Sequence, residues 1–230
     1  MYKILEKTQF SEKVFKFRIE APQMAKHAHA GQFLMVRANE CGERVPFTFA
    51  DWNPEEGWVE FIFMVIGKTT QMLSTYEAGD SLQDVTGPLG EPTEMGEGKW
   101  AVIGGGVGLA IAFPVARQLA AAGREVHAIM GARTKELLLL EDQFRSILDD
   151  EHIHITTDDG SLGEKGVVTA PLERLLQDKQ VDRVFCVGPV PMMKFSTLTA
   201  EKYDTPIIAS LNPIMVDGTG MCGCCRVEVG

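Results

Sequence analysis

Three of the chain's five cysteines lie close together in the stretch MVDGTGMCGCCRVEVG, where they occupy positions 222, 224 and 225. Neighbouring cysteines on a short loop cannot readily form disulfides with one another, so the pattern favours a metal site over a disulfide framework. With an aspartate in the first position, the register Asp217-x4-Cys222-x2-Cys225 has the spacing of a plant-type [2Fe-2S] loop.

We therefore predict Asp217, Cys222 and Cys225 as iron ligands and Cys224 as a non-ligand. A fourth ligand is missing, because the chain ends at Gly230 in a segment, RVEVG, that has the pattern of a strand. We expect the fourth cysteine beyond residue 230, so that the cluster site of this chain is incomplete. The alternative for Asp217 is that it caps the loop through its own backbone.

Zinc is the alternative for the thiols. Structural zinc usually takes two separated pairs of ligands, whereas the thiols form one crowded group. We find no Cys or His pair that complements them: His27 and His29 are far away in the chain and are expected on a solvated loop.

A second candidate site is the stretch VIGGGVGLA, which joins a predicted strand to a predicted helix. Glycines at such a junction let the backbone approach a pyrophosphate, whose charge the helix N-terminus favours. The spacing is not the usual dinucleotide fingerprint, and the glycines could equally serve a tight turn. The residues predicted to bind a cofactor are Gly104, Gly105, Gly106 and Gly108.

The stretch CVGPVPMM follows another predicted strand. Cys186, Gly188 and Pro189 are therefore expected at the carboxyl edge of a sheet, where open α/β sheets bind ligands. Cys186 could instead be a buried, small apolar residue.

Two stretches of the first half also offer groups for a cofactor. In RVPFTFAD, Arg44 is a fixed cation suited to phosphate, and Pro46 sets an extended strand that presents Phe47 and Thr48. An aromatic ring beside a hydroxyl suits a flavin, because the ring packs while the hydroxyl bonds the flavin edge. The alternative is an ordinary barrel strand with a solvated Arg44.

The second of these stretches is VIGKTTQML, which has enough hydrogen-bond donors for a diphosphate. The predicted donors are Gly67, Lys68, Thr69 and Thr70. They could equally form a polar loop that caps a helix beginning near Gln71.

The elements that must position these residues change character along the chain. Runs such as KVFKFRIEA, GQFLMVRA and WVEFIFMVI alternate between apolar and polar residues, which predicts an antiparallel β-barrel. From WAVIGG onward strands alternate with helices, including LAIAFPVARQLAAAG and KELLLLEDQFRSIL, which predicts a parallel sheet covered on both faces. We therefore predict an N-terminal antiparallel β-barrel over 1–97, an α/β domain over 98–210 and the start of a truncated module over 211–230.

Composition limits the classes of partner. The 230 residues carry a formal net charge of -10, which argues against nucleic acid or an anionic membrane as the main partner. No apolar run approaches the roughly 20 residues of a membrane span. The start, MYKILEKTQF, lacks the apolar core of a signal peptide, so a cytoplasmic protein is expected.

These motifs, in this order, resemble the ferredoxin reductase superfamily, in which a flavin-binding β-barrel precedes a nicotinamide-binding α/β domain. RVPFTF is similar to its flavin motif with Pro46 inserted, GGGVG to its nicotinamide phosphate loop and CVGPVPMM to its Cys-Gly motif. GKTTQML, GPLGEP, TDDGSLGEKGVVT and the cysteine-rich loop resemble one branch. That branch holds the electron-transfer subunits of dihydroorotate dehydrogenase B, sulfide dehydrogenase and NADH-dependent ferredoxin:NADP oxidoreductase.

The resemblance implies FAD, a [2Fe-2S] cluster, NAD or NADP as substrate, and a larger catalytic flavoprotein subunit as partner. It implies that NAD(P)H gives hydride to FAD without a general base, with Thr48 near flavin N5 and Cys186 near the nicotinamide. It also assigns Asp159, within TDDGSLGEKGVVT, to cofactor binding.

The identity of the partner and of the nucleotide stays open at this stage. The aspartate at position 217 is similar to the sulfide dehydrogenase and transhydrogenase forms, which favours a glutamate-synthase-like partner over a dihydroorotate dehydrogenase catalytic subunit. An alternative of another class is a non-catalytic docking subunit with vestigial cofactor pockets. Arg133 could meet the 2′-phosphate of NADP or be solvated.

Overall fold

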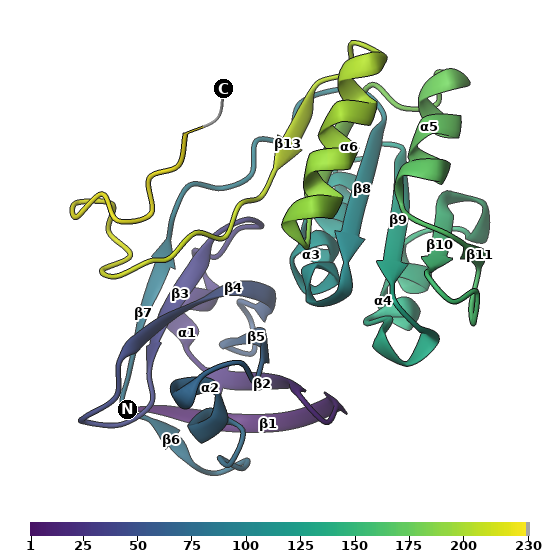
Figure 1. Ribbon diagram of the computed structural model, residues 1–230. Helices are drawn as coiled ribbons and strands as arrows, with labels where there is room; N and C mark the ends of the chain where they lie inside the picture. The colour runs from purple at the N-terminus through teal and green to yellow at the C-terminus, as the bar shows by residue number, and fades with distance from the viewer. Residues whose placement is uncertain (229–230) are drawn as a thin grey trace. The chain divides into compact units, whose positions relative to one another are not determined.

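The computed structural model describes residues 1–228. The chain divides into two compact units, Glu94–Leu211 and Met1–Thr93, the latter joined by the tail that begins at Asn212 (Figure 1). Within the described residues there is no helix with the length and apolar character that crossing a membrane requires.

The first unit is a near-closed antiparallel barrel, as predicted. Its seven strands run in the order β6-β1-β2-β5-β4-β3-β7. The strands are β1 (Tyr2–Ser11), β2 (Val14–Glu20), β3 (Phe33–Arg37), β4 (Arg44–Asn53), β5 (Trp58–Met64), β6 (Ser81–Leu82) and β7 (Asp84–Leu89). Two short helices accompany them, α1 (Pro22–Ala25) and α2 (Lys68–Leu73).

Strict alternation of residue type builds the barrel. In β2 the side chains of Phe15, Phe17 and Ile19 are buried in the barrel core, while the intervening Lys16 and Arg18 lie on the other face. Successive side chains of a strand point to opposite faces, so the pattern KVFKFRIEA fixes which face of β2 forms the core.

The outer face of the barrel carries a compact ion-pair network. Glu60 of β5 is only 6% exposed and accepts hydrogen bonds from Lys16 Nζ at 3.1 Å and Arg18 Nε at 2.8 Å. Glu6 of β1 reaches the same two cations. These charges stabilise the register of β1, β2 and β5, which lie side by side in the sheet.

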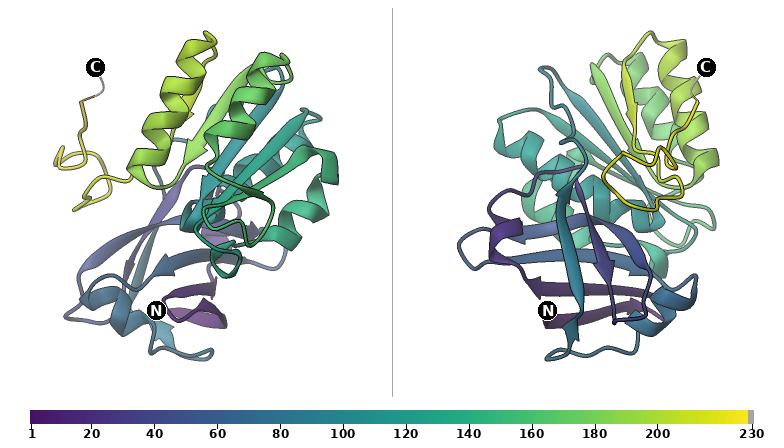
Figure 2. Two further views of the ribbon diagram at one scale, coloured as in Figure 1. Left: turned by 45° about the vertical axis from the view of Figure 1, so that its right-hand side comes forward. Right: turned by 90° about the vertical axis from the view of Figure 1, so that its left-hand side faces the viewer.

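The second unit is a six-stranded sheet in the order β11-β10-β9-β8-β12-β13, in which every pair is parallel, as predicted. Helices α3 and α4 lie on one face, and α5 and α6 on the other (Figures 1 and 2). The strands are β8 (Trp100–Gly105), β9 (Val126–Ala132), β10 (Ile153–Thr157), β11 (Glu164–Lys165), β12 (Arg183–Val187) and β13 (Ile207–Ala209). The helices are α3 (Leu109–Ala121), α4 (Glu141–Ile147), α5 (Thr169–Gln177) and α6 (Val190–Lys202), with 3-10 turns η1 (Gly106–Gly108), η2 (Lys135–Leu137) and η3 (Asp150–His152).

One helix is shorter than the sequence pattern predicts. KELLLLEDQFRSIL was expected to be helical throughout, but it begins with the turn η2 and becomes α-helical only at Glu141. Leu140 adopts a left-handed conformation with φ 61°, which interrupts the helix just before that residue. Glu141 and Asp142 then occupy the first turn, where acidic side chains favour a helix start.

The tail, where we predicted the start of a truncated module over 211–230, is irregular. Between Asn212 and Glu228 it has neither helix nor strand, and it groups with the barrel unit. Gly218 is buried there, so close to Met35 and Leu89 that a methyl group would contact both side chains. The predicted strand RVEVG is not formed over 226–228, and its last two residues lie outside the described part of the chain.

Candidate functional site

Sheet topology brings the glycine loop and the Cys-Gly motif together. From β8 the chain builds outward through β9 and β10, and it then returns to add β12 and β13 on the other side of β8. The carboxyl ends of β8 and β12 are thus the switch point of the sheet, where open α/β folds bind ligands. Gly104 pairs directly with Val187, so GGGVG and CVGP leave adjacent strands.

The glycines of GGGVG have two different roles. A methyl group on Gly104 would lie 2.7 Å from Leu109 Cδ2, and one on Gly108 would lie 2.5 Å from the Val187 carbonyl oxygen. These glycines permit close packing of the loop against α3 and β12. Gly106 differs, because it has φ +54° and nothing lies within 4 Å of the position a methyl group would take. Its backbone is therefore open to a ligand.

The Cys-Gly motif packs against the same loop. A methyl group on Gly188 would lie 2.7 Å from Met192 Cε and 3.1 Å from Gly105 Cα, so this close packing requires a glycine. Pro189 is the exposed N-cap of α6, a helix of 13 residues. The N-terminus of α6 adds a favourable field for an anion at this edge.

Cys186 itself is fully buried in β12, within the apolar core of the α/β unit. Burial raises the pKa of its thiol to about 11. A neutral, inaccessible thiol packs as a small apolar group, which corresponds to the alternative interpretation of this residue.

Asp159 and Arg133 also lie at the carboxyl edge of the sheet, following β10 and β9. The backbone N–H of Asp159 donates to the Arg133 carbonyl at 3.3 Å, which holds the two loops together. The Asp159 carboxylate accepts hydrogen bonds from the side chain and backbone of Ser161, and these bonds lower its pKa. Asp159 therefore shapes its own turn, while Arg133 is exposed beside the strand that carries the glycine loop.

In the barrel, Arg44 forms an ion pair. It opens β4, and its guanidinium Nη2 lies 2.6 Å from the Asp84 carboxylate of β7. Both side chains are partly exposed, so the pair is accessible to a ligand phosphate that would compete with Asp84.

The strand that follows presents two groups in different ways. The Phe47 ring stacks on Phe61 at 4.9 Å and packs against the barrel core. Pro46 and Thr48 are half-buried, opposite Met35 and Phe33 of β3. No residue in the described part of the chain hydrogen-bonds the Thr48 hydroxyl, so it is available to the edge of a flavin.

In the Gly67–Thr70 segment, α2 begins at Lys68, whereas the alternative interpretation expected a helix from near Gln71. The Thr70 hydroxyl accepts the backbone N–H groups of Ile66 at 3.0 Å and Gly67 at 3.1 Å. The hydroxyl also donates to the Gly67 carbonyl at 3.0 Å, so it caps the helix and is no longer a free donor for a diphosphate. Lys68 is exposed and Thr69 half-buried, and among residues 1–228 neither side chain has a partner.

The cysteine loop does not gather the three predicted iron ligands. The Asp217 carboxylate accepts the backbone N–H of Thr219 at 2.9 Å and of Cys222 at 3.2 Å, and these bonds lower its pKa. The described residues contain two groups of three possible ligand atoms within 4.8 Å, and neither includes Asp217, Cys222 or Cys225. The donor types suit iron, so the assignment of Asp217, Cys222 and Cys225 stays a prediction, and we derive no electron-transfer step through a cluster.

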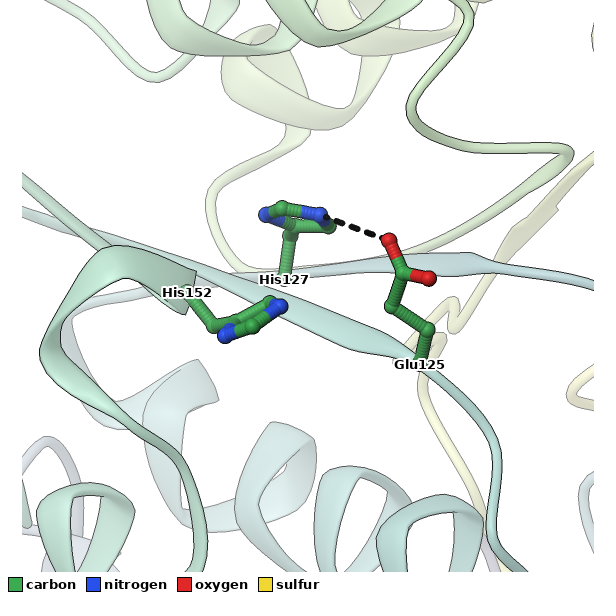
Figure 3. A group of neighbouring side chains, drawn as sticks. All are labelled: Glu125, His127 and His152. Carbon is green, nitrogen blue, oxygen red and sulfur yellow. Dashed lines mark ion pairs between the residues drawn. The ribbon is translucent and has the colours of Figure 1, made fainter.

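A group of titratable side chains at the opposite, amino edge of the parallel sheet was not predicted from the sequence. Glu125 precedes β9, His127 lies on β9, and His152 ends η3 just before β10 (Figure 3). His154 of β10 completes the group, and burial lowers its pKa to about 4. The available signal was the pair of alternating histidines in HIHITT, which we read only as a strand.

Comparison with known proteins covers both units. The family model "Oxidoreductase FAD-binding domain" matches residues 1–93, and "Oxidoreductase NAD-binding domain" matches residues 102–197. The Thermotoga maritima protein named "Dihydroorotate dehydrogenase B (NAD(+)), electron transfer subunit homolog" is 48% identical over 98% of this chain and 79% of its own length. The corresponding electron transfer subunit of Desulforamulus reducens is 33% identical over 99% of this chain and 87% of its own length.

A solved structure is also similar over nearly the whole chain. It is a chain from the NADH-dependent reduced ferredoxin-NADP oxidoreductase, with 46% identity and a TM-score of 0.89, covering 98% of this chain and 81% of that one. The likeness extends over both the barrel and the α/β unit.

Proposed function

The chain belongs to the oxidoreductase family with FAD-binding and NAD-binding domains that includes the electron transfer subunits of dihydroorotate dehydrogenase B, and from this we propose that it passes electrons between NAD(P)H and a larger flavoprotein subunit. The glycine loop and the start of α6 would hold the nicotinamide nucleotide. The barrel residues Arg44, Thr48, Lys68 and Thr69 would hold FAD.

The observation that carries this proposal is the open backbone at Gly106. At three of the four loop glycines, neighbouring atoms occupy the position that a methyl group would take. At Gly106 that position is open, and it lies at the switch point of the sheet. A phosphate there would meet backbone N–H groups and the ends of two helices, which is the arrangement that favours a pyrophosphate.

The barrel supplies binding groups and no acid or base. Arg44 would release Asp84 and pair with a phosphate instead. Lys68, an exposed cation, would also bind phosphate. Thr48 would donate its hydroxyl to the isoalloxazine edge. FAD, when bound, accepts hydride from the nicotinamide and passes the electrons on. Thr70 and Gly67 are proposed only as the support of this segment.

The direct test is anaerobic addition of NADH, and separately of NADPH, to the protein loaded with FAD. We expect loss of the oxidised flavin absorbance with at least one nucleotide. If neither nucleotide reduces the flavin, the proposal is wrong and the docking interpretation is favoured. Absence of bound FAD after denaturation of the native protein would favour the same conclusion.

We further propose that the partner is a flavoprotein of the ferredoxin:NADP oxidoreductase type. The support is the high identity to a chain of that enzyme together with the aspartate at position 217. A catalytic subunit of dihydroorotate dehydrogenase is the second candidate, because the curated relatives carry that name. Mass spectrometry of the protein that co-purifies with the native subunit distinguishes them.

The remaining assignments are also proposals. They are the iron ligands Asp217, Cys222 and Cys225, the boundaries near residues 98 and 211, the approach of Cys186 and Asp159 to the nucleotide, and a cytoplasmic location. For each of them a separate measurement is needed, and those for the cysteines are given below.

A further inference from the structure

The group at the amino edge of the parallel sheet has the composition of a metal site. Glu125, His127 and His152 each offer one ligand atom, and the three atoms lie within 4.8 Å of one another (Figure 3). Two imidazoles and a carboxylate are a donor set typical of zinc, whereas calcium and magnesium prefer oxygen ligands alone.

The central histidine carries an independent sign of a missing partner. His127 is 6% exposed, and its Nε2 atom is buried without a hydrogen-bond partner among the described residues. A buried polar atom without a partner requires an explanation, and an ion is one of the few that apply. Glu125 Oε1 lies 3.6 Å from this Nε2 atom, too far for a hydrogen bond.

The other nitrogen of His127 is already oriented. Its Nδ1 atom lies 3.2 Å from Nε2 of His154. When Nδ1–H donates to His154, the lone pair of His127 Nε2 points at Glu125. Metal-binding histidines are usually fixed in this way, by a hydrogen bond from the nitrogen that does not bind the metal.

The carboxylate can serve a metal without losing its existing partner. Lys99 Nζ lies 2.9 Å from Glu125 Oε2 and donates a hydrogen bond to Oε1 at 3.1 Å, and Oε1 is also the atom that faces His127. Monodentate binding through Oε1 would replace the Lys99 hydrogen bond on that oxygen and leave the ion pair with Lys99 on Oε2.

Access to the group comes from a surface hollow. A cavity of about 440 Å³ is lined by residues that include Glu125 and His152. Asp149 and Glu151 lie within the same reach of His152, so a carboxylate or a water can take a fourth position. Metal binding here would tie the strand β9 to the turn η3.

We propose that Glu125, His127 and His152 bind a divalent transition-metal ion of the zinc class, which stabilises the amino edge of the parallel sheet. The site lies at the opposite end of β8 and β9 from the glycine loop, so the ion takes no part in hydride transfer. The proposal does not depend on the function proposed above.

The test uses Co²⁺ as the probe, because tetrahedral Co²⁺ absorbs strongly in the visible range. The chain is loaded with FAD, treated with a chelator, and carries Ser in place of Cys222, Cys224 and Cys225, so that tail thiols cannot bind the ion. We expect one Co²⁺ per chain, displaced by Zn²⁺, with no thiolate charge-transfer band. Retention of binding in this variant supports the proposal, and its loss overturns it.

Two ligand variants locate the ion. Glu125 and His152 lie toward the surface, so the Glu125→Gln and His152→Gln proteins should both fold. Each substitution should weaken Co²⁺ binding at least about 10-fold. His29→Gln changes an exposed histidine of the barrel and should leave binding unchanged. Equal Co²⁺ affinity in His152→Gln and the parent would show that the ion binds elsewhere.

A second readout is independent of the cobalt spectrum. Zn²⁺ should raise the unfolding temperature of the parent chain, because a ligand that binds the folded state stabilises it. The shift should be absent in His152→Gln and present in His29→Gln. A shift of the same size in all three proteins would contradict the proposal.

Discussion

At the scale of single residues, Gly106 offers the sharpest test of nucleotide binding. Gly106→Ala places a methyl group in the open space over the loop, where a phosphate would approach. We expect the Kd for the nucleotide that reduces the flavin to rise about 10-fold, which corresponds to about 1.4 kcal/mol. Isothermal titration with the nucleotide measures the change.

Gly123→Ala is the matched control for this variant. Gly123 also has a positive φ, +72°, with open space around its Cα, but it follows the far end of α3. Both substitutions should cost about 1 kcal/mol of stability, because both force alanine into a left-handed conformation. Equal loss of nucleotide affinity in the two variants would show that Gly106 has no specific role.

The tail cysteines permit a second prediction at this scale, made for the native protein purified anaerobically with its partner. Cys224→Ser should leave an iron-sulfur spectrum nearly intact, whereas Cys222→Ser and Cys225→Ser should abolish or strongly perturb it. The reason is the register: Cys222 and Cys225 have the C-x2-C spacing of a plant-type loop, and Cys224 lies between these two ligands. Absorption and electron paramagnetic resonance spectra measure the outcome. Loss of the cluster in Cys224→Ser, with retention in Cys225→Ser, would refute the register.

The sequence was informative about residue types at this scale and less so about their partners. Glycine spacing was sufficient to locate the loop, but the separate role of Gly106 depends on which atoms pack behind each glycine. Arg44 was recognisable as a cation, yet its pairing with Asp84 reaches across the intervening strand β3 and has no local signal in the sequence. His127 and His152 were missed because their proximity arises from the parallel pairing of β9 and β10.

At the scale of elements, the ion pairs on the outer barrel face lead to a stability prediction. Glu60→Gln leaves Lys16 and Arg18 in place without the carboxylate that both of them bind. We expect a loss of about 2 kcal/mol in the free energy of unfolding, because Glu60 is almost fully buried. Urea denaturation near neutral pH measures it.

Glu6→Gln serves as the comparison. Glu6 binds the same cations, but its side chain is 41% exposed, so solvent screens the pair and we expect a loss of about 0.5 kcal/mol. If the two variants lose the same stability, burial does not decide the strength of these pairs.

Two helices, α4 and α2, begin at other residues than the sequence pattern predicts, and both differences have local physical causes. Apolar content in KELLLLEDQFRSIL suggested one long helix, whereas the left-handed Leu140 divides it. In VIGKTTQML the helix α2 starts three residues earlier than expected, because the Thr70 hydroxyl satisfies backbone N–H groups at the helix start. Propensity alone does not specify such a cap, while the long alternating strands and α3 were predictable from periodicity.

At the scale of the whole molecule, the α/β unit uses the two ends of one sheet differently. The carboxyl ends of β8 and β12 gather glycines and helix N-termini, which suit an anionic nucleotide. The amino ends of β9 and β10 gather imidazoles and carboxylates, which suit a cation. Parallel pairing makes this division possible, since every strand ends at the same edge. A ligand at either end would stabilise the unit without competing for the other.

The buried thiol of Cys186 gives a prediction for the stability of this unit at alkaline pH. In the folded chain the thiol stays protonated up to a pKa of about 11, because burial disfavours the thiolate. In the unfolded chain it ionises near its ordinary pKa of about 8.5. Between these values the unfolded state binds fewer protons, so stability falls as pH rises, by about 2 kcal/mol at about pH 10.

Cys186→Ala should remove this pH-dependent loss, although the small cavity it creates costs about 1 kcal/mol at every pH. Cys41→Ala is the control, because it also removes one thiol, but from an exposed position of the barrel unit. Urea denaturation at about pH 8 and about pH 10 measures the difference for each protein. The Cys41 variant should lose stability as the parent does, since other groups that titrate in this range affect both equally. An identical alkaline loss in Cys186→Ala would show that the buried thiol does not set the pH dependence.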